Sequence, residues 1–166
     1  MSDPRRYVEL ILANRIFASL EIADAAALYK AGELLKYPAE HTLFNRGDEA
    51  DGFLLILGGS LSVISDGGEK LASLGVGETV GEMGLVMAGP RSALVATEVE
   101  SLVWHLPGAV FEDLLQQGDP IGTSILRGVG RDMCHRFRKV VDEGERLTIE
   151  IKGGDRADLE ALGWDF

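Results

Sequence analysis

The sequence lacks several features that would place it in a functional class at once. Among 166 residues there is one cysteine, Cys134, so no internal disulfide and no metal site made only of cysteines can form. This composition fits a reducing compartment. No apolar run is long enough to cross a bilayer, and the opening MSDPRRYVELILANR, interrupted by Glu9, Asn14 and Arg15, makes a poor signal peptide. We therefore predict a cytoplasmic protein with no membrane segment.

Positive charge is also scarce. The chain has 16 lysines and arginines against 27 acidic residues, which gives a formal net charge of −11. A field of this sign repels nucleic acids, anionic membranes and small anionic ligands alike. A phosphate site in this protein would therefore have to be built locally.

The residues of metal and catalytic sites do not cluster in the sequence. Its three histidines, His41, His105 and His135, are scattered, and no His-x-His pair lies on a predicted strand. No nucleophile, base and orienting group form a recognisable set. We therefore predict neither a metal site nor an enzyme.

Glycine, by contrast, is plentiful, with 21 residues. Between 37 and 106, short runs rich in Val, Ile, Leu and Phe alternate with glycine-containing turns, which is typical of the strands of a barrel. Apolar stripes at helical spacing lie on both sides. The predicted fold is mostly β with flanking helices: a double-stranded β-helix, or jelly-roll, barrel. One domain, 1–143, would comprise N-terminal helices at 7–36, the barrel at 37–106 and C-terminal helices at 109–142; a tail at 144–166 follows, in which LTIEI predicts a strand.

The stretch VGEMGLVMAGPRSALVAT, residues 80–97, sets one acid and one base nine positions apart in an apolar context. The simplest interpretation is a partly buried ion pair in a bend between strands. However, Gly81 allows close backbone approach, a short helix beginning there would expose unpaired N–H groups, and Arg91 offers a planar fork for two phosphate oxygens. Glu82 beside an anion would need hydroxyl donors. The chemistry indicates a small ligand that carries a sugar hydroxyl and a phosphate.

The segment GEMGLVMAGPRSALV resembles the phosphate-binding cassette of cyclic nucleotide-binding domains, whose pattern is Gly-Glu, small-Leu, then Arg-(Ser/Thr/Ala)-Ala. YPAEHTLFNRGDEADGFLLILGGSLSVI is similar to the first strands of that family, and LGVGETVGE to its run into the cassette, here 80–93. The long helix from Ile121 resembles the family's C-terminal hinge and dimer helix. The resemblance covers most of residues 17–143.

The resemblance implies roles for nine residues of this chain. Glu82 would accept a hydrogen bond from the ribose 2′-hydroxyl, and Arg91 would pair with the cyclic phosphate. Ser92 would touch the phosphate or the base. The remaining residues would supply backbone around phosphate and ribose (Gly81, Met83 and Gly84) or line the pocket (Leu74, Val80 and Ala93).

The chain departs from the bacterial regulators of the family in two places. Hydroxyl residues on their long helix reach the purine, whereas Val140 and Val141 occupy the corresponding region here. Arg131, Phe137 or Arg138 are candidates to cap the base by stacking instead. In addition, no helix-turn-helix domain follows the long helix, so we predict no direct DNA binding.

The predicted function is a non-catalytic sensor that binds a cyclic nucleotide, cAMP first and cGMP second. Its C-terminal helices, 109–142, would move on binding and signal to an unknown protein partner, and the helix at 121–142 would form a homodimer. Two alternatives stay open. One is a ligand-independent dimerisation module, and the other is an anti-regulator that pairs with related transcription factors.

Overall fold

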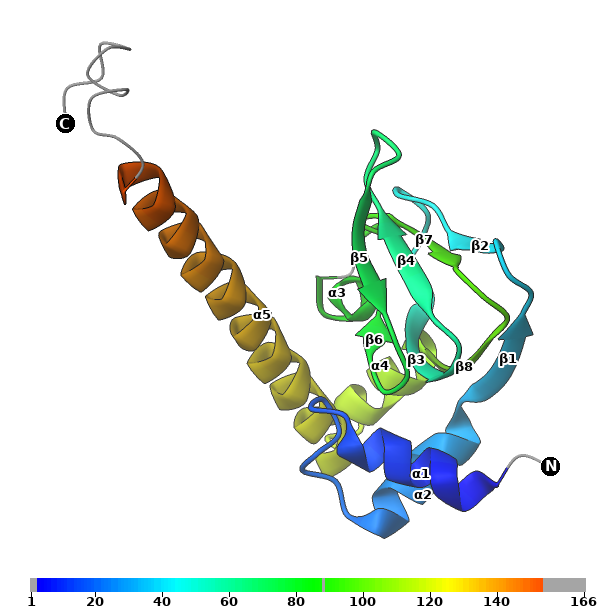
Figure 1. Cartoon of the computed structure of the whole chain (residues 1–166). Helices are drawn as coiled ribbons and strands as arrows, with labels where there is room; N and C mark the ends of the chain where they lie inside the picture. Colours follow the sequence, from blue (N-terminus) through cyan, green and yellow to red (C-terminus); the bar gives the residue numbers. More distant parts are fainter. Residues whose placement is uncertain (1–2, 88, 154–166) are drawn as a thin grey trace. The chain divides into compact units, whose positions relative to one another are not determined.

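The structure is a computed structural model that describes residues 3–87 and 89–153, in which the chain forms five helices and eight strands (Figure 1). The helices are α1 (Pro4–Ala13), α2 (Ile22–Ala31), α3 (Glu82–Met87), α4 (Gly108–Gln116) and α5 (Pro120–Gly153). The strands are β1 (Glu33–Tyr37), β2 (Thr42–Phe44), β3 (Gly52–Gly58), β4 (Leu61–Ile64), β5 (Lys70–Leu74), β6 (Thr79–Val80), β7 (Leu94–Thr97) and β8 (Ser101–Pro107). The chain divides into two compact units, 1–129 and 130–166, with the boundary inside α5.

The strands form two antiparallel sheets, ordered β1-β8-β3-β6 and β2-β7-β4-β5. Buried apolar side chains from both sheets form one core cluster: Leu54, Ile56, Leu61, Val80, Val95 and Val103. Two sheets whose inner faces share a core are the architecture of a jelly roll. The predicted fold class, a jelly-roll barrel with N-terminal helices and a long C-terminal helix, is therefore confirmed.

Strand β3, GFLLILG, is apolar almost without a break because both of its faces are covered. Successive side chains of a strand point to opposite faces. Leu54 and Ile56 enter the core cluster, whereas on the other face Phe53 stacks on Phe17, with ring centroids 5.6 Å apart. Helices α1 and α4 contact this strand.

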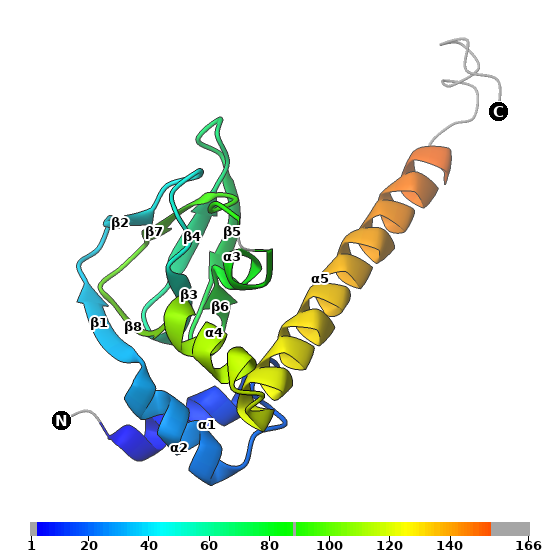
Figure 2. The same cartoon turned by 180° about the vertical axis from the view of Figure 1, so that it is seen from behind.

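Trp104 fastens the N-terminal helices to the barrel. Its Nε1 donates a hydrogen bond of 3.1 Å to the carbonyl of Tyr29 at the end of α2. A Cβ on Gly32 would lie 2.3 Å from that Nε1, so only glycine allows this approach. Figure 2 shows α1 and α2 side by side at one end of the barrel, where they contact each other.

Two sequence-based predictions of secondary structure are wrong. Residues 33–36 were expected to be helical, but Glu33–Tyr37 is strand β1, paired with β8; a run of five residues fits either period, and pairing in the tertiary structure decides. LTIEI at 147–151 was expected to be a strand, but α5 continues to Gly153. Extending an existing helix adds one hydrogen bond for each residue fixed, whereas an isolated strand gains none.

No helix among the described residues combines the length and apolar character that a membrane-crossing segment needs.

Candidate functional site

The turn between β6 and α3 requires glycine at position 81. The φ angle of Gly81 is +89°, a left-handed conformation that costs other residues roughly 1–2 kcal/mol. A Cβ at this position would lie 2.2 Å from Nη1 of Arg91. Gly81 therefore lets the backbone at the start of α3 pass directly against the guanidinium group; its approach to a phosphate stays a prediction.

The side chain of Arg91 is buried, with 3% of its surface exposed, and its partners surround it. Nη1 donates to the carbonyl of Gly52 at 2.8 Å and to that of Gly81 at 3.3 Å. Nη2 donates to Oδ1 of Asp51 at 2.7 Å. The guanidinium Cζ lies 4.1 Å from the centroid of the Phe44 ring.

The backbone of Arg91 is held by the same loop between β2 and β3. Its N–H donates to the carbonyl of Asp48 at 2.8 Å, and its carbonyl accepts from the N–H of Gly47 at 2.9 Å. Five residues of one short segment thus contact either the backbone or the guanidinium group of this arginine. They form the arginine socket: Phe44, Gly47, Asp48, Asp51 and Gly52.

One polar atom in the socket is left over. Nε of Arg91 is buried and has no hydrogen-bond partner among the described residues. Buried N–H groups are nearly always paired, and an unpaired one costs about 1–3 kcal/mol. The atom therefore suits an acceptor supplied by a ligand, and a phosphate oxygen is an acceptor that guanidinium groups bind well.

Glu82 follows Gly81 directly and is also buried, with 4% of its surface exposed. It lies in the first turn of α3. Because α3 has only six residues, its macrodipole is short, and Arg91 supplies the larger positive charge at this position.

The structure brings some of the remaining cassette residues into the barrel and leaves others at the surface. Val80 belongs to the core cluster and Leu74 packs against it. Gly84 and Ala93 are half-buried. Met83, 40% exposed, and Ser92 face solvent. Gly81 thus contacts Arg91 and is followed directly by Glu82, with Val80 and Leu74 at the core cluster.

The candidate base-cap residues Arg131, Phe137 and Arg138 belong to α5 in the second unit. All three are exposed, Phe137 by 69%. Their role stays a prediction.

Sequence reasoning missed the socket. All five residues lie in the stretch that resembles the family's first strands, but Asp51 and Phe44 had no signal of their own, since an acid before a strand and an aromatic within one are both ordinary. Two strand pairings bring them to the cassette: β2 pairs with β7, the strand that follows Arg91, and β3 pairs with β6, the strand that precedes Gly81.

Tyr37 packs against the core cluster. Burial raises the pKa of its phenol above the ordinary value, and the negative charge of Asp51 raises it further. The ring of Tyr37 stacks on that of His41, with centroids 5.0 Å apart.

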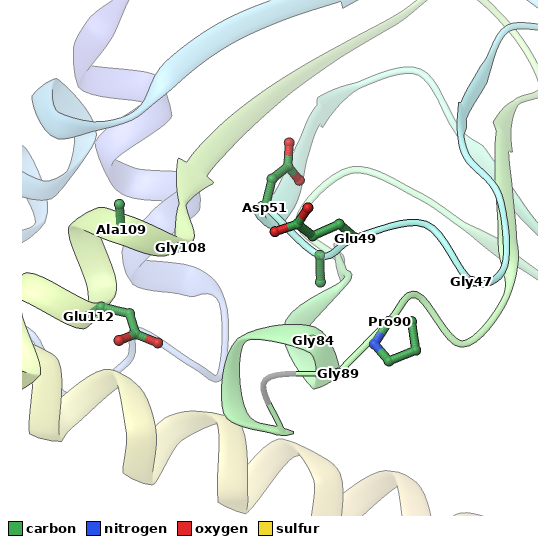
Figure 3. Close-up of a pocket in the computed structure, with 10 residues that line it drawn as sticks. Gly47, Glu49, Asp51, Gly84, Gly89, Pro90, Gly108, Ala109 and Glu112 are labelled. Atoms are coloured by element: carbon green, nitrogen blue, oxygen red, sulfur yellow. The ribbon is translucent and has the colours of Figure 1, made fainter.

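A cavity of about 620 Å³ adjoins the socket on loop 47–51 and α4 (Figure 3). Three carboxylates line it, those of Glu49, Asp51 and Glu112, but neither Glu82 nor Arg91 does. Its acidic lining repels an anion. The lining therefore makes this cavity unsuited to a phosphate group. Within the described ranges, no three His, Cys, Asp or Glu side chains converge as a metal site requires.

The profile of the cyclic nucleotide-binding domain matches residues 34–118, just over half of the chain. The chain belongs to the cyclic nucleotide-binding domain family. The matched span runs from β1 past α4 and includes α3 and Arg91. The resemblance seen in the sequence is thereby confirmed.

Relatives include several proteins in which this domain is a part. A Pycsar effector protein of Xanthomonas perforans is 28% identical over 160 residues, 95% of this chain and 50% of that protein. A cAMP-dependent protein kinase regulatory subunit of Yarrowia lipolytica is 28% identical over 105 residues, 63% of this chain and 28% of that protein. The chain spans half or less of the length of the curated relatives it matches. The crystal structure of a cyclic nucleotide-binding domain from Methylobacillus flagellatus superposes with a TM-score of 0.75 at 25% identity, covering 86% of this chain and 85% of that one.

Proposed function

We propose that the protein is a non-catalytic sensor that binds a cyclic nucleotide, cAMP in preference to cGMP. The observation that carries the proposal is the buried guanidinium of Arg91, whose Nε has no hydrogen-bond partner in the described part of the chain. A buried cation with an unpaired N–H donor suits a ligand that carries one negative charge, as a cyclic phosphate does. The kinase regulatory subunit of Yarrowia, named for its cAMP dependence, supports cAMP as the first choice.

Each cassette residue has a proposed part in binding. Arg91 pairs with the phosphate, and Gly81, Met83 and Gly84 supply backbone beside phosphate and ribose. Glu82 accepts the ribose 2′-hydroxyl, which explains a buried carboxylate so near an anion site, because a hydroxyl donor offsets its desolvation. Leu74, Val80 and Ala93 form apolar walls, and Ser92 touches phosphate or base.

The deciding experiment is isothermal titration of nucleotide-free protein with cAMP, cGMP and 2′-deoxy-cAMP. We expect micromolar or tighter binding of cAMP and clearly weaker binding of the deoxy analogue. The variant Glu82→Ala completes a thermodynamic cycle of protein variant against ligand analogue. It should bind cAMP with the affinity that the unmodified protein has for 2′-deoxy-cAMP. It should also bind cAMP and 2′-deoxy-cAMP equally well. No heat with any nucleotide would overturn the proposal.

Binding would be signalled through movement of the C-terminal helices, α4 and α5, to a protein partner. Cyclic nucleotides change nothing in such a sensor unless they bind its two conformations with different affinity. Hydrogen exchange of α4 and α5 with and without cAMP measures this, and identical exchange rates would argue against a moving helix.

A second candidate function rests on the surface of α5. Phe137 and Val140 are each 69% exposed and Val141 is 41% exposed, and their spacing places them on one face of the helix. Such a face fits dimerisation through residues 121–142, with ligand or without it, or pairing with related transcription factors. Light scattering of the unmodified protein and of Phe137→Glu, each with and without cAMP, distinguishes these cases: a monomer at all concentrations would remove the dimer.

A further inference from the structure

Phe44 touches Arg91 in a way that no other residue of the socket does. Gly52, Gly81 and Asp51 accept hydrogen bonds from the N–H groups of the guanidinium, whereas the Cζ of Arg91 lies over the face of the Phe44 ring, 4.1 Å from its centroid. The face of an aromatic ring is electron-rich and attracts a cation at this distance. The contact is therefore a cation–π interaction.

An irregularity in strand β2 turns Phe44 toward Arg91. Thr42 pairs with Ala96 and Phe44 with Val95, so the register between β2 and β7 shifts by one residue across Leu43. In a regular strand Leu43 and Phe44 would point to opposite faces, but both pack against the core cluster. Bulges commonly re-aim a side chain in this manner next to functional sites.

The face contact and the edge contacts respond differently to an anion. An incoming phosphate meets the guanidinium in its plane, where it competes with Asp51 for Nη2. The Asp51 side chain is 74% exposed, so its attraction is screened by water. The Phe44 contact joins the ring face to Cζ and uses none of the N–H donors, so it persists when the hydrogen-bond partners change.

We propose that Phe44 is a positioning residue for the phosphate of the cyclic nucleotide. Its ring fixes the plane of the Arg91 guanidinium, so that Nε and the adjacent edge meet the anion. The inference rests on the proposed function, because it concerns how the same arginine binds the same ligand.

Fluorinated phenylalanines at position 44 test the inference. Fluorine withdraws electrons from the ring face with little change in ring volume, so mono-, di- and trifluorinated rings weaken the cation–π contact in steps. Affinity for cAMP should fall in the same steps, by about 2- to 30-fold over the series. Phe53, a fully buried ring that stacks on Phe17, is the matched control: fluorination there should leave affinity unchanged.

Conventional variants give a second readout. Phe44→Trp keeps an electron-rich face and should retain binding, whereas Phe44→Leu keeps apolar volume without a face and should bind more weakly. A packing role would give the reverse order, because leucine fits the space of phenylalanine better than tryptophan does.

The outcomes separate this inference from the proposed function. A flat series at position 44 in protein that binds cAMP would overturn the positioning role and leave the sensor intact, as would equal losses at positions 44 and 53. If the unmodified protein binds neither cAMP nor cGMP, the sensor and the positioning role are both overturned.

Discussion

Two charged side chains at different places in the barrel, Arg91 and Glu98, are each held by several partners. Arg91 lies in the cassette, between α3 and β7, and Glu98 lies in the turn between β7 and β8. Arg91 is held by the arginine socket, a single segment of chain, and by the carbonyl of Gly81. Glu98 accepts from the hydroxyls of Ser60, Ser62 and Ser73 and pairs with Lys70, and so ties β4 and β5 to the turn.

The two side chains differ in whether a hydrogen-bonding atom is left without a partner. Both oxygens of Glu98 accept at least two hydrogen bonds, and the hydrogen bond from Lys70, followed by those from the three serines, holds the pKa of its carboxyl far below the ordinary value. The Arg91 network leaves Nε without a partner in the described chain. A completed network stabilises the fold, whereas an incomplete one suits a ligand.

Replacing Arg91 should therefore have the largest effect, and on binding. Each charge-assisted hydrogen bond contributes roughly 1.5–3 kcal/mol, so Arg91→Ala should weaken cAMP binding by about a hundredfold or more. Isothermal titration measures the loss, and circular dichroism checks that the variant folds. Arg46→Ala is the matched control, since Arg46 is 59% exposed and pairs with Asp66 at the surface; it should bind like the unmodified protein. Near-normal affinity in Arg91→Ala would remove the site assignment.

The next largest effect is expected at Gly81, because a side chain there disturbs Arg91 itself. Gly81 and Gly77 have nearly equal φ angles, +89° and +87°, but a Cβ on Gly77 meets nothing within 4 Å, whereas one on Gly81 meets Nη1 of Arg91. Gly77→Ala should cost only the backbone term, about 1–2 kcal/mol of unfolding free energy. Gly81→Ala should cost more and should also weaken cAMP binding at least tenfold. Equal stability losses and normal binding in both variants would show that Arg91 moves aside freely.

The cassette and the fold class could both be predicted from the sequence alone. The cassette residues Gly81, Glu82 and Arg91 were recognisable because their pattern is local: glycine for the turn, an acid and a base in an apolar run. The jelly roll was recognisable from short apolar runs between glycine turns. Each of the two signals is made of residues that lie close together in the sequence.

What the sequence did not reveal depends on distant pairing. Asp51 and Phe44 lie about 40 positions or more before Arg91. They meet it because β2 pairs with β7, β3 pairs with β6, and a bulge turns Phe44 inward. The strand Glu33–Tyr37 was mistaken for helix because only its partner β8 decides its conformation. Residue types do not indicate such contacts, because the contacts depend on which strands pair and in which register.

A smaller effect is expected at Asp51, the in-plane competitor for Arg91. Asp51→Asn keeps an oxygen acceptor but removes the charge that opposes a phosphate. Since Asp51 is 74% exposed, stability should fall by about 1 kcal/mol or less. Binding of cAMP should tighten by about 2- to 5-fold, the result of a small screened charge. Glu49→Gln removes the same charge from the same loop; an equal gain there would assign the effect to net charge rather than to the pair.

The smallest effect is expected at Glu98, and on stability alone. Glu98→Gln should leave cAMP binding unchanged, because the carboxylate serves the hairpin and not the socket. Its folded-state pKa lies below the ordinary value of 4.5, so the stabilisation it provides is fully present above that value and is lost as pH falls toward the folded-state pKa. The melting temperature of Glu98→Gln should accordingly lie below that of the unmodified protein at pH 7, and the gap should close as pH falls below 4.5. A gap that stays constant across this range would mean that the stability lost in Glu98→Gln does not depend on ionisation of the carboxyl group, and that the charge of Glu98 contributes nothing to the fold.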